Sequence, residues 1–107
     1  MLYKFKSKAG GDVIMMGPQG DQMLQLLGRA PAAKGIFQAA DLAQAIETLS
    51  RAVADDEAAF GKAQADAKAA GEAAPRRDGV QLKQRVWPLI ELMRQSLAEK
   101  TDVVWGV

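Results

Sequence analysis

The sequence predicts an α+β fold in which about three helices pack on one face of a small, mainly antiparallel sheet of three strands. Three observations lead to this prediction. Charged and apolar residues alternate at the N-terminus, as in a strand with one buried face. An apolar stripe with helical spacing runs through residues 81–100, and β-branched and aromatic residues are frequent in 101–107. We expect an N-terminal hairpin and a C-terminal strand to form the sheet, within a single domain of residues 1–107.

The first sixteen residues predict the hairpin. Tyr3 and Phe5 alternate with lysines, which places the two rings on one face of a strand and the lysines on the other. The turn is expected at residues 9–12, because its paired glycines tolerate the positive φ of a tight turn. Residues 13–16 are apolar on both faces, which predicts a strand inside the sheet beside the first one.

A short helix is predicted next. Residues 17–21 contain a proline, which the first turn of a helix tolerates, and residues 23–27 are strongly apolar. Gly28 suits the position just after the helix end. A loop is expected over 29–35, and residues 36–37 are either a brief extended segment or an apolar anchor.

A long helix is predicted to begin between Gln38 and Asp41. Two N-terminal arrangements are open, either Gln38 as N-cap with Phe37 packed on Leu42, or a capping box formed by Asp41 and Gln44. The apolar spacing of four, three and four then continues the helix, at Leu42, Ile46, Leu49 and Val53.

Beyond Phe60 the long helix has only methyl groups to bury. Its alanines keep the helix propensity high, but without large apolar side chains this part cannot pack firmly. We therefore predict that residues 61–79 project from the body or are mobile.

The helix over residues 81–100 is expected to form the inner wall of the core. Trp87 and Ile90 widen its apolar side. Pro88 lies inside the pattern, so either it kinks the helix or the helix proper starts near it. The following segment, 101–107, is expected to pair with the N-terminal hairpin. The apolar stripe that needs this cover consists of Leu82, Val86, Leu89, Met93 and Leu97.

The residue inventory argues against catalysis. The chain has no Cys and no His, which removes thiol nucleophiles, disulfides, thiolate zinc sites and the commonest general base. Residues 55–57 are three consecutive acids, but adjacent helical positions diverge by about 100°, so they do not converge on one metal ion. We see no nucleophile with a base and an orienting group. The sequence thus predicts no enzyme, no catalytic residue, no cofactor and no metal site.

Charge and hydropathy restrict the partners. The net charge is +1, made up of +3 over residues 1–38, −4 over 39–72 and +2 over 73–107. This balance does not predict a committed nucleic-acid binder. No run approaches the roughly 18 apolar residues of a membrane span, and the N-terminus is not a signal peptide, so we expect a cytoplasmic protein without membrane contact.

Four residues are candidates for contact with a protein partner. Trp is enriched at interaction hot spots, although core packing is the commoner role for Trp87 and Trp105. Trp105 is the first choice, because a strand near the C-terminus could pair with a partner at a sheet edge. Lys4 and Lys6 line one face of the first strand, where a solvated face that discourages strand pairing is the simpler interpretation.

Four other residues are candidates for contact with an anion. The turn at 17–21 precedes a helix and could offer backbone N–H groups, including that of Gly20, to a phosphate. It lacks the Lys-Ser/Thr pair of a P-loop, which favours a simple turn. Basic side chains near the last helix could contribute, namely Arg76, Arg77 and Arg85.

Five stretches carry a family resemblance: MLYKFKSKAGGDVIMMGPQGDQMLQLLG at 1–28, PAAKGIF at 31–37, RRDGV at 76–80, RVWPLIELM at 85–93 and VVWGV at 103–107. In these stretches the chain resembles a bacterial family described as a domain of unknown function, DUF1840. The Ala-rich middle is the variable part. The resemblance implies a small, single-domain bacterial protein of uncharacterised role, and it supplies no catalytic residues.

Two functional hypotheses follow. The first is a non-catalytic interaction module that self-associates or docks on a larger protein. The alternative is a domain that binds a small molecule or an anion through the 17–21 turn and nearby arginines.

Overall fold

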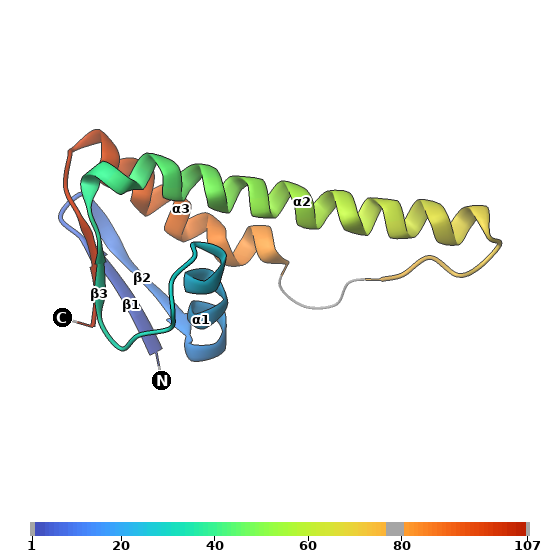
Figure 1. The fold of residues 1–107 in the computed structure, drawn as a ribbon, viewed down its shortest axis with the longest axis horizontal. Helices are drawn as coiled ribbons and strands as arrows, with labels where there is room; N and C mark the ends of the chain where they lie inside the picture. The colour runs from blue at the N-terminus through green and yellow to red at the C-terminus, as the bar shows by residue number, and fades with distance from the viewer. Residues whose placement is uncertain (1, 77–80, 107) are drawn as a thin grey trace.

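The computed structural model describes residues 2–76 and 81–106. It confirms an α+β fold, with an antiparallel sheet of four strands instead of three and helices on one face of it (Figure 1). The sheet order is β2-β1-β4-β3. The elements are β1 (Leu2–Ser7), β2 (Gly10–Met16), α1 (Gly17–Leu26), β3 (Gly35–Phe37), the 3₁₀ helix η1 (Ala39–Asp41), α2 (Leu42–Ala69), α3 (Leu82–Ala98) and β4 (Val103–Trp105).

Strand β3 gives β4 a neighbouring strand on its second side. It pairs with β4 through Ile36 and Val104, so β4 lies inside the sheet between β1 and β3. Strand β2 is therefore the edge, and the expectation that residues 13–16 form an interior strand is wrong. Met15 faces the core, whereas Ile14 and Met16 are 61% and 60% exposed.

The hairpin turn also differs from the prediction. Strand β2 already begins at Gly10, and neither Gly10 nor Gly11 has a positive φ. A Cβ at Gly10 would lie 2.2 Å from Oε1 of Gln95, the end of an exposed side chain that can move away. The predicted glycine turn was wrong, because the turn lies at residues 8–9 and both glycines belong to β2.

Four of the six aromatic rings form a row on the inner face of the sheet. Tyr3 stacks on Phe5 with a centroid distance of 6.0 Å, and Phe5 lies 5.7 Å from Trp105. Phe37 completes the row at 5.0 Å from Trp105. All four side chains are at most 2% exposed, so this row is the floor of the core.

Helix α3 covers this floor. The predicted stripe is buried at Val86, Leu89 and Met93, while Leu97 is 37% exposed. Ser96 hydrogen-bonds the Ser7 hydroxyl across a distance of 2.7 Å, which links α3 to β1. The helix continues through Pro88, so the proline does not mark its start.

Helix ends follow one pattern. The second residue after the end of each α-helix has a positive φ, namely Gly28, Gly71 and Lys100. The next N–H then bonds the carbonyl five residues back, as from Arg29 to Leu24 at 2.8 Å. This confirms the role predicted for Gly28.

At the start of the long helix, Gln38 is the N-cap residue of η1, and the alternative capping box of Asp41 is not formed. Neither Gln38 nor Asp41 makes a side-chain cap bond, and α2 is preceded by η1. The carboxylate of Asp102, just before β4, instead accepts the Ala39 N–H at 2.8 Å. A residue distant in sequence therefore anchors this end.

Helix α2 extends well past the body, and its second half projects from it (Figure 1). The helical part of the predicted projecting segment ends at Ala69, and residues 77–79 of that segment lie outside the described residues. Of the described helices, none is long and apolar enough to cross a membrane.

Helix α1 packs against the sheet through Tyr3. Its ring lies against Gly20, where a Cβ would be 2.0 Å from Cδ2 of the ring. The Tyr3 hydroxyl donates a hydrogen bond to Asp21. This bond, burial and the charge of the carboxylate raise the pKa of Tyr3 above 10.0.

Gly20→Ala is expected to lower the free energy of unfolding by about 1–3 kcal/mol, because the methyl group overlaps the buried ring. The matched control is Gly61→Ala, where a Cβ meets nothing within 4 Å. That control should raise stability by about 1 kcal/mol, since alanine favours the helix. Urea unfolding measures both, and equal effects would contradict the packing of Tyr3 on α1.

Alkaline pH is expected to destabilise the protein through Tyr3. The folded protein holds the phenolic proton of Tyr3 more tightly than the unfolded chain does, which stabilises the folded state. This stabilisation is complete below pH 10.0 and is lost as the pH rises through the folded-state pKa of Tyr3. Tyr3 is the single tyrosine, so the ultraviolet absorbance of tyrosinate reports it alone. Tyr3→Phe should remove this part of the pH dependence, and a midpoint below 10 in the folded protein would contradict the bond to Asp21.

Candidate functional site

The outer face of the sheet, opposite the helices, is the candidate functional surface (Figure 1). Alternation along the strands decides its composition, because Tyr3, Phe5 and Trp105 point inward and their neighbours point outward. The outward side chains are Leu2, Lys4, Lys6, Asp12, Ile14, Met16, Ile36 and Val104.

Two apolar clusters lie on this outer face. Leu2 is paired with Met16 in the sheet, with Ile14 two residues along β2, and Leu2 is 62% exposed. On the other side of the sheet, Ile36 pairs with Val104 and is 40% exposed. Large apolar side chains gathered on one open face are typical of a contact surface.

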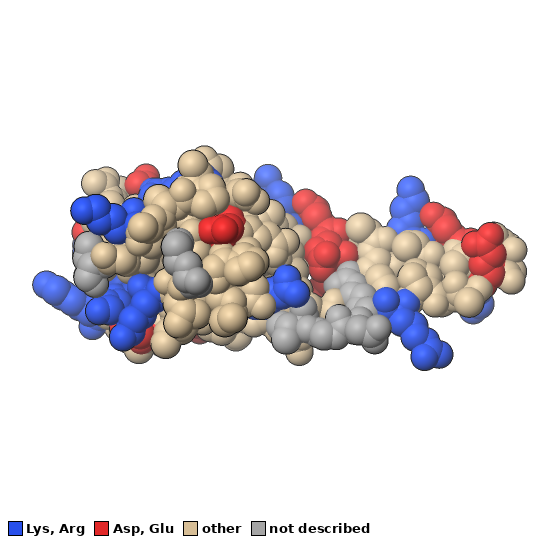
Figure 2. All heavy atoms as spheres, turned by 90° about the horizontal axis from the view of Figure 1, so that it is seen from below, with Lys and Arg blue, Asp and Glu red and all other residues tan. Residues whose placement is uncertain are grey.

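Lysines separate the two apolar clusters. Lys4 pairs with Ile14, and Lys6 pairs with Val104. The ammonium of Lys4 also lies 3.6 Å from the carboxylate of Asp12. Figure 2 shows Lys and Arg side chains gathered at the end of the molecule formed by the sheet, and Asp and Glu where α2 leaves the body.

The two tryptophans, both candidates for a partner contact, lie in different environments. Trp105, the first choice for a partner contact, is 2% exposed in an interior strand, so the predicted edge position is wrong. Its Nε1 donates to the carbonyl of Ala32 at 3.0 Å. Trp87, expected on the apolar side of its helix, is 47% exposed, with the Arg94 guanidinium 5.3 Å from its ring centroid.

The predicted anion contacts do not come together. Gly20 is buried beneath Tyr3, so it offers no open turn to a phosphate. Arg76 and Arg85 line different grooves among the described residues, and Arg77 lies outside them. Gly20 is therefore not an open contact, and anion binding through the arginines stays a prediction.

Arg85 has an unusual environment. Its Nε is buried without a hydrogen-bond partner, and its Nη1 makes one long bond of 3.4 Å to Gln22 on α1. A buried donor without a partner costs about 1–3 kcal/mol.

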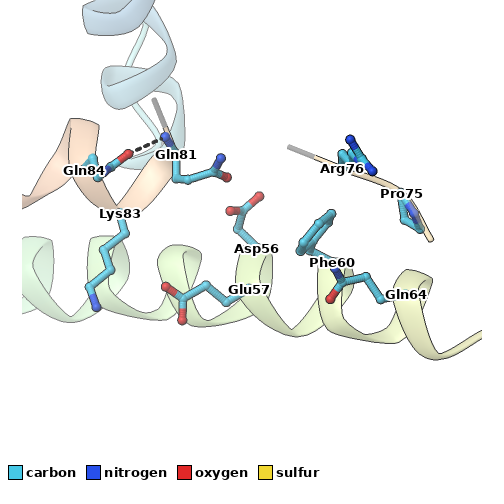
Figure 3. A pocket seen from close by; sticks show the side chains of 9 residues that line it. All are labelled: Asp56, Glu57, Phe60, Gln64, Pro75, Arg76, Gln81, Lys83 and Gln84. Atoms are coloured by element: carbon cyan, nitrogen blue, oxygen red, sulfur yellow. Dashed lines mark hydrogen bonds between the residues drawn. The ribbon is translucent and has the colours of Figure 1, made fainter. Parts of the chain in front are cut away.

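An open groove of about 650 Å³ lies between α2, the start of α3 and the segment that precedes it (Figure 3). Phe60 lies between α2 and the segment carrying Pro75, and Asp56 points towards the start of α3. Gln84 accepts the Gln81 N–H at 2.9 Å and so fixes that helix start. The complete lining is Asp56, Glu57, Phe60, Gln64, Pro75, Arg76, Gln81, Lys83 and Gln84.

This groove mixes both charge signs around amides, and its chemistry is that of a solvated helix surface. Only two of the three consecutive acids line it, since Asp55 lies on another side of α2. Within 2–76 and 81–106, no three acidic side chains are placed to hold a metal ion.

One comparison with known proteins gives a match. The family described as "Domain of unknown function (DUF1840)" matches residues 1–105 of the 107-residue chain. The chain belongs to this family. No curated protein and no solved structure matches it. The match to DUF1840 covers both the strands that form the outer face and α2, so the whole described fold lies within the family's domain apart from Gly106.

The outer face could not be found from sequence alone, although one signal pointed to it. Residues 13–16 are apolar on both faces, which is equally compatible with an interior strand and with an edge strand whose outer side chains are exposed. The pairing of β4 with β1 decides between these possibilities, and the period of a strand does not reveal which neighbour it takes.

Arg85→Met is expected to leave the free energy of unfolding unchanged or to raise it by up to about 1 kcal/mol, because the methionine keeps the packed stem and removes the buried donor. Arg85→Ala should destabilise, since it also removes the stem. Thermal unfolding of both variants checks this. An equal loss of stability in Arg85→Met and Arg85→Ala would show that the guanidinium itself makes a stabilising interaction.

Proposed function

We propose that this member of the DUF1840 family is a non-catalytic interaction module that binds a protein partner through the outer face of its sheet. The observation that carries the proposal is the exposure of Leu2, Ile14 and Met16, each 60–62% open on one face. The inner face is fully used by the helices, so a partner is the remaining source of cover for these side chains.

The lysines favour a protein partner with carboxylates around an apolar centre. Lys6 has no ion pair among the described residues, and Lys4 shares its charge with Asp12 alone. Charges at the rim of an interface steer association and set specificity, while the apolar centre supplies most of the affinity.

Replacement of the apolar cluster around Leu2 is expected to abolish partner binding. The variant Leu2→Ser, Ile14→Ser and Met16→Ser removes exposed apolar groups at positions where folding does not depend on burial. Binding is measured by light scattering of the purified protein and by capture from the source cells, with identical amounts of wild type and variant. The partner, whether a second copy or another protein, should be retained by wild type and lost by the variant.

The matched control is Trp87→Ser, which removes an exposed aromatic residue on α3, away from the outer face of the sheet. It should bind as wild type does. Loss of binding with Trp87→Ser and none with the outer-face variant would contradict the proposal. Binding of wild type to anionic vesicles and to no protein would contradict it as well.

A further inference from the structure

Strand β2 is a long edge that pairs on one side only. It spans seven residues, and β1 is the single strand beside it in the described sheet. The opposite edge, β3, has three residues. Each alternate N–H and C=O on the free side of β2 is therefore available to another strand.

Over residues 13–16 this edge lacks the features that normally prevent strand pairing. Proteins protect long edges with lysine, proline, a bulge or an inward charge. Strand β2 contains neither lysine nor proline. It carries one extra residue between Gly10 and Val13, opposite β1 residues Phe5 to Ser7, but its pairing with β1 is regular over residues 13–16. Its one charged residue, Asp12, lies at this irregularity and forms an ion pair with Lys4 at 3.6 Å. The exposed side chains at the edge are Ile14 and Met16.

No helix fills the space beside the edge. A groove of about 360 Å³ runs between β2 and the first half of α3. Residues 12–15 form one wall, and the other consists of Gln19, Gln84, Arg85 and Pro88. A neighbouring strand lies about 4.8 Å from the edge, so an incoming main chain can reach β2 along this groove.

We propose that a second copy of this chain pairs with β2, with the two β2 strands antiparallel about a two-fold axis. Two four-stranded sheets would then join into one of eight strands. This inference rests on the proposed function, whose partner it identifies.

The residue pattern of β2 is complementary to itself. A two-fold axis at Ile14 sets Ile14 opposite its own copy on the outer face, and Val13 opposite Met15 on the inner face. Asp12 then lies opposite Met16, and the two Asp12 carboxylates are separated by about 13 Å along the strand. No like charges face each other, and apolar residues meet at the centre.

Helix α3 adds to the same interface. It runs antiparallel to β2, because Gly10 lies against Gln95 while Met15 shares the groove with Gln84. Of the α3 side chains beside the seam, Gln84, Pro88 and Gln95 are exposed and uncharged, and Arg85 in the groove wall carries a charge. The α3 side of the seam is therefore mostly uncharged.

The expected contact is small. A seven-residue edge with part of one helix buries on the order of 1,000 Å² in total, at the low end of specific interfaces. A dimer that forms in the micromolar range is the expected result, so protein concentration is the variable to scan.

Disulfide crosslinking tests the register, because the chain has no cysteine of its own. Ile14→Cys places two thiols at directly opposed positions, where Cα atoms lie about 4.5–5.5 Å apart and a disulfide forms. Mild oxidation should give a covalent dimer on a non-reducing gel. Ile36→Cys, on the other edge strand, is the matched control and should stay monomeric.

Sedimentation equilibrium tests the same edge without crosslinks. Ile14→Lys supplies the missing edge lysine and should shift the protein to monomer at concentrations where wild type is dimeric. Ile36→Lys is the control and should leave the dimer intact. Circular dichroism confirms that both variants fold, as expected for exposed positions.

The outcomes separate this inference from the proposed function. Wild type that stays monomeric at several hundred micromolar, a dimer insensitive to Ile14→Lys, or crosslinking at position 36 in place of 14 would each overturn the pairing of β2. If such a protein still captures a different partner through the outer face, the proposed function stands and the self-pairing is wrong.

Discussion

The row of aromatic rings on the inner face of the sheet is the constraint on which the rest of the structure depends. Tyr3 and Phe5 from β1 meet Trp105 from β4, with Phe37 from β3 beyond it. The row joins strands from both ends of the chain, so neither end can be placed without the other. It also dictates glycine where a ring meets backbone, because a Cβ at Gly35 would lie 2.3 Å from the Trp105 ring. Turn propensity is a weaker explanation for such glycines than this lack of space.

A sheet with this inner face needs one layer of helices, and residues 2–76 and 81–106 provide no second layer. Most of the large apolar side chains are used in the single core. The other two aromatic residues do not join it, since Phe60 lies along α2 at a groove and Trp87 is 47% exposed. The outer face of the sheet and the distal half of α2 therefore stay uncovered for the same reason. This one-sided architecture favours a contact surface over a deep pocket as the functional element.

The sequence was sufficient to predict elements that carry a strong local signal, such as a regular spacing of apolar residues. Alternation around Tyr3 and Phe5 predicted β1, the apolar stripe predicted the face of α3 that is buried, and Gly28 predicted a helix end. It was insufficient where tertiary contacts decide. The interior position of Trp105 depends on β3, three residues that pair with β4, so it could not be derived from the surroundings of Trp105 in the sequence. Trp87 lies at the margin of the α3 stripe, where a helical period does not distinguish buried from exposed. The cap at Ala39 comes from Asp102, a residue far along the chain.

The edge position of β2 explains its composition better than an interior position would. A strand in a sheet that helices cover on one face needs apolar side chains on that face only. Ile14 and Met16 are apolar and point to the other, solvent-exposed face. Lysines occupy the outer face of the neighbouring β1, where main-chain groups are already paired, and they are absent from β2, where an edge lysine would protect. Charge is therefore placed where it keeps the sheet face hydrated and is missing where it would block an incoming strand. That distribution is the opposite of the one expected for an edge that must stay unpaired, and it links the exposed apolar face and the open edge into one surface.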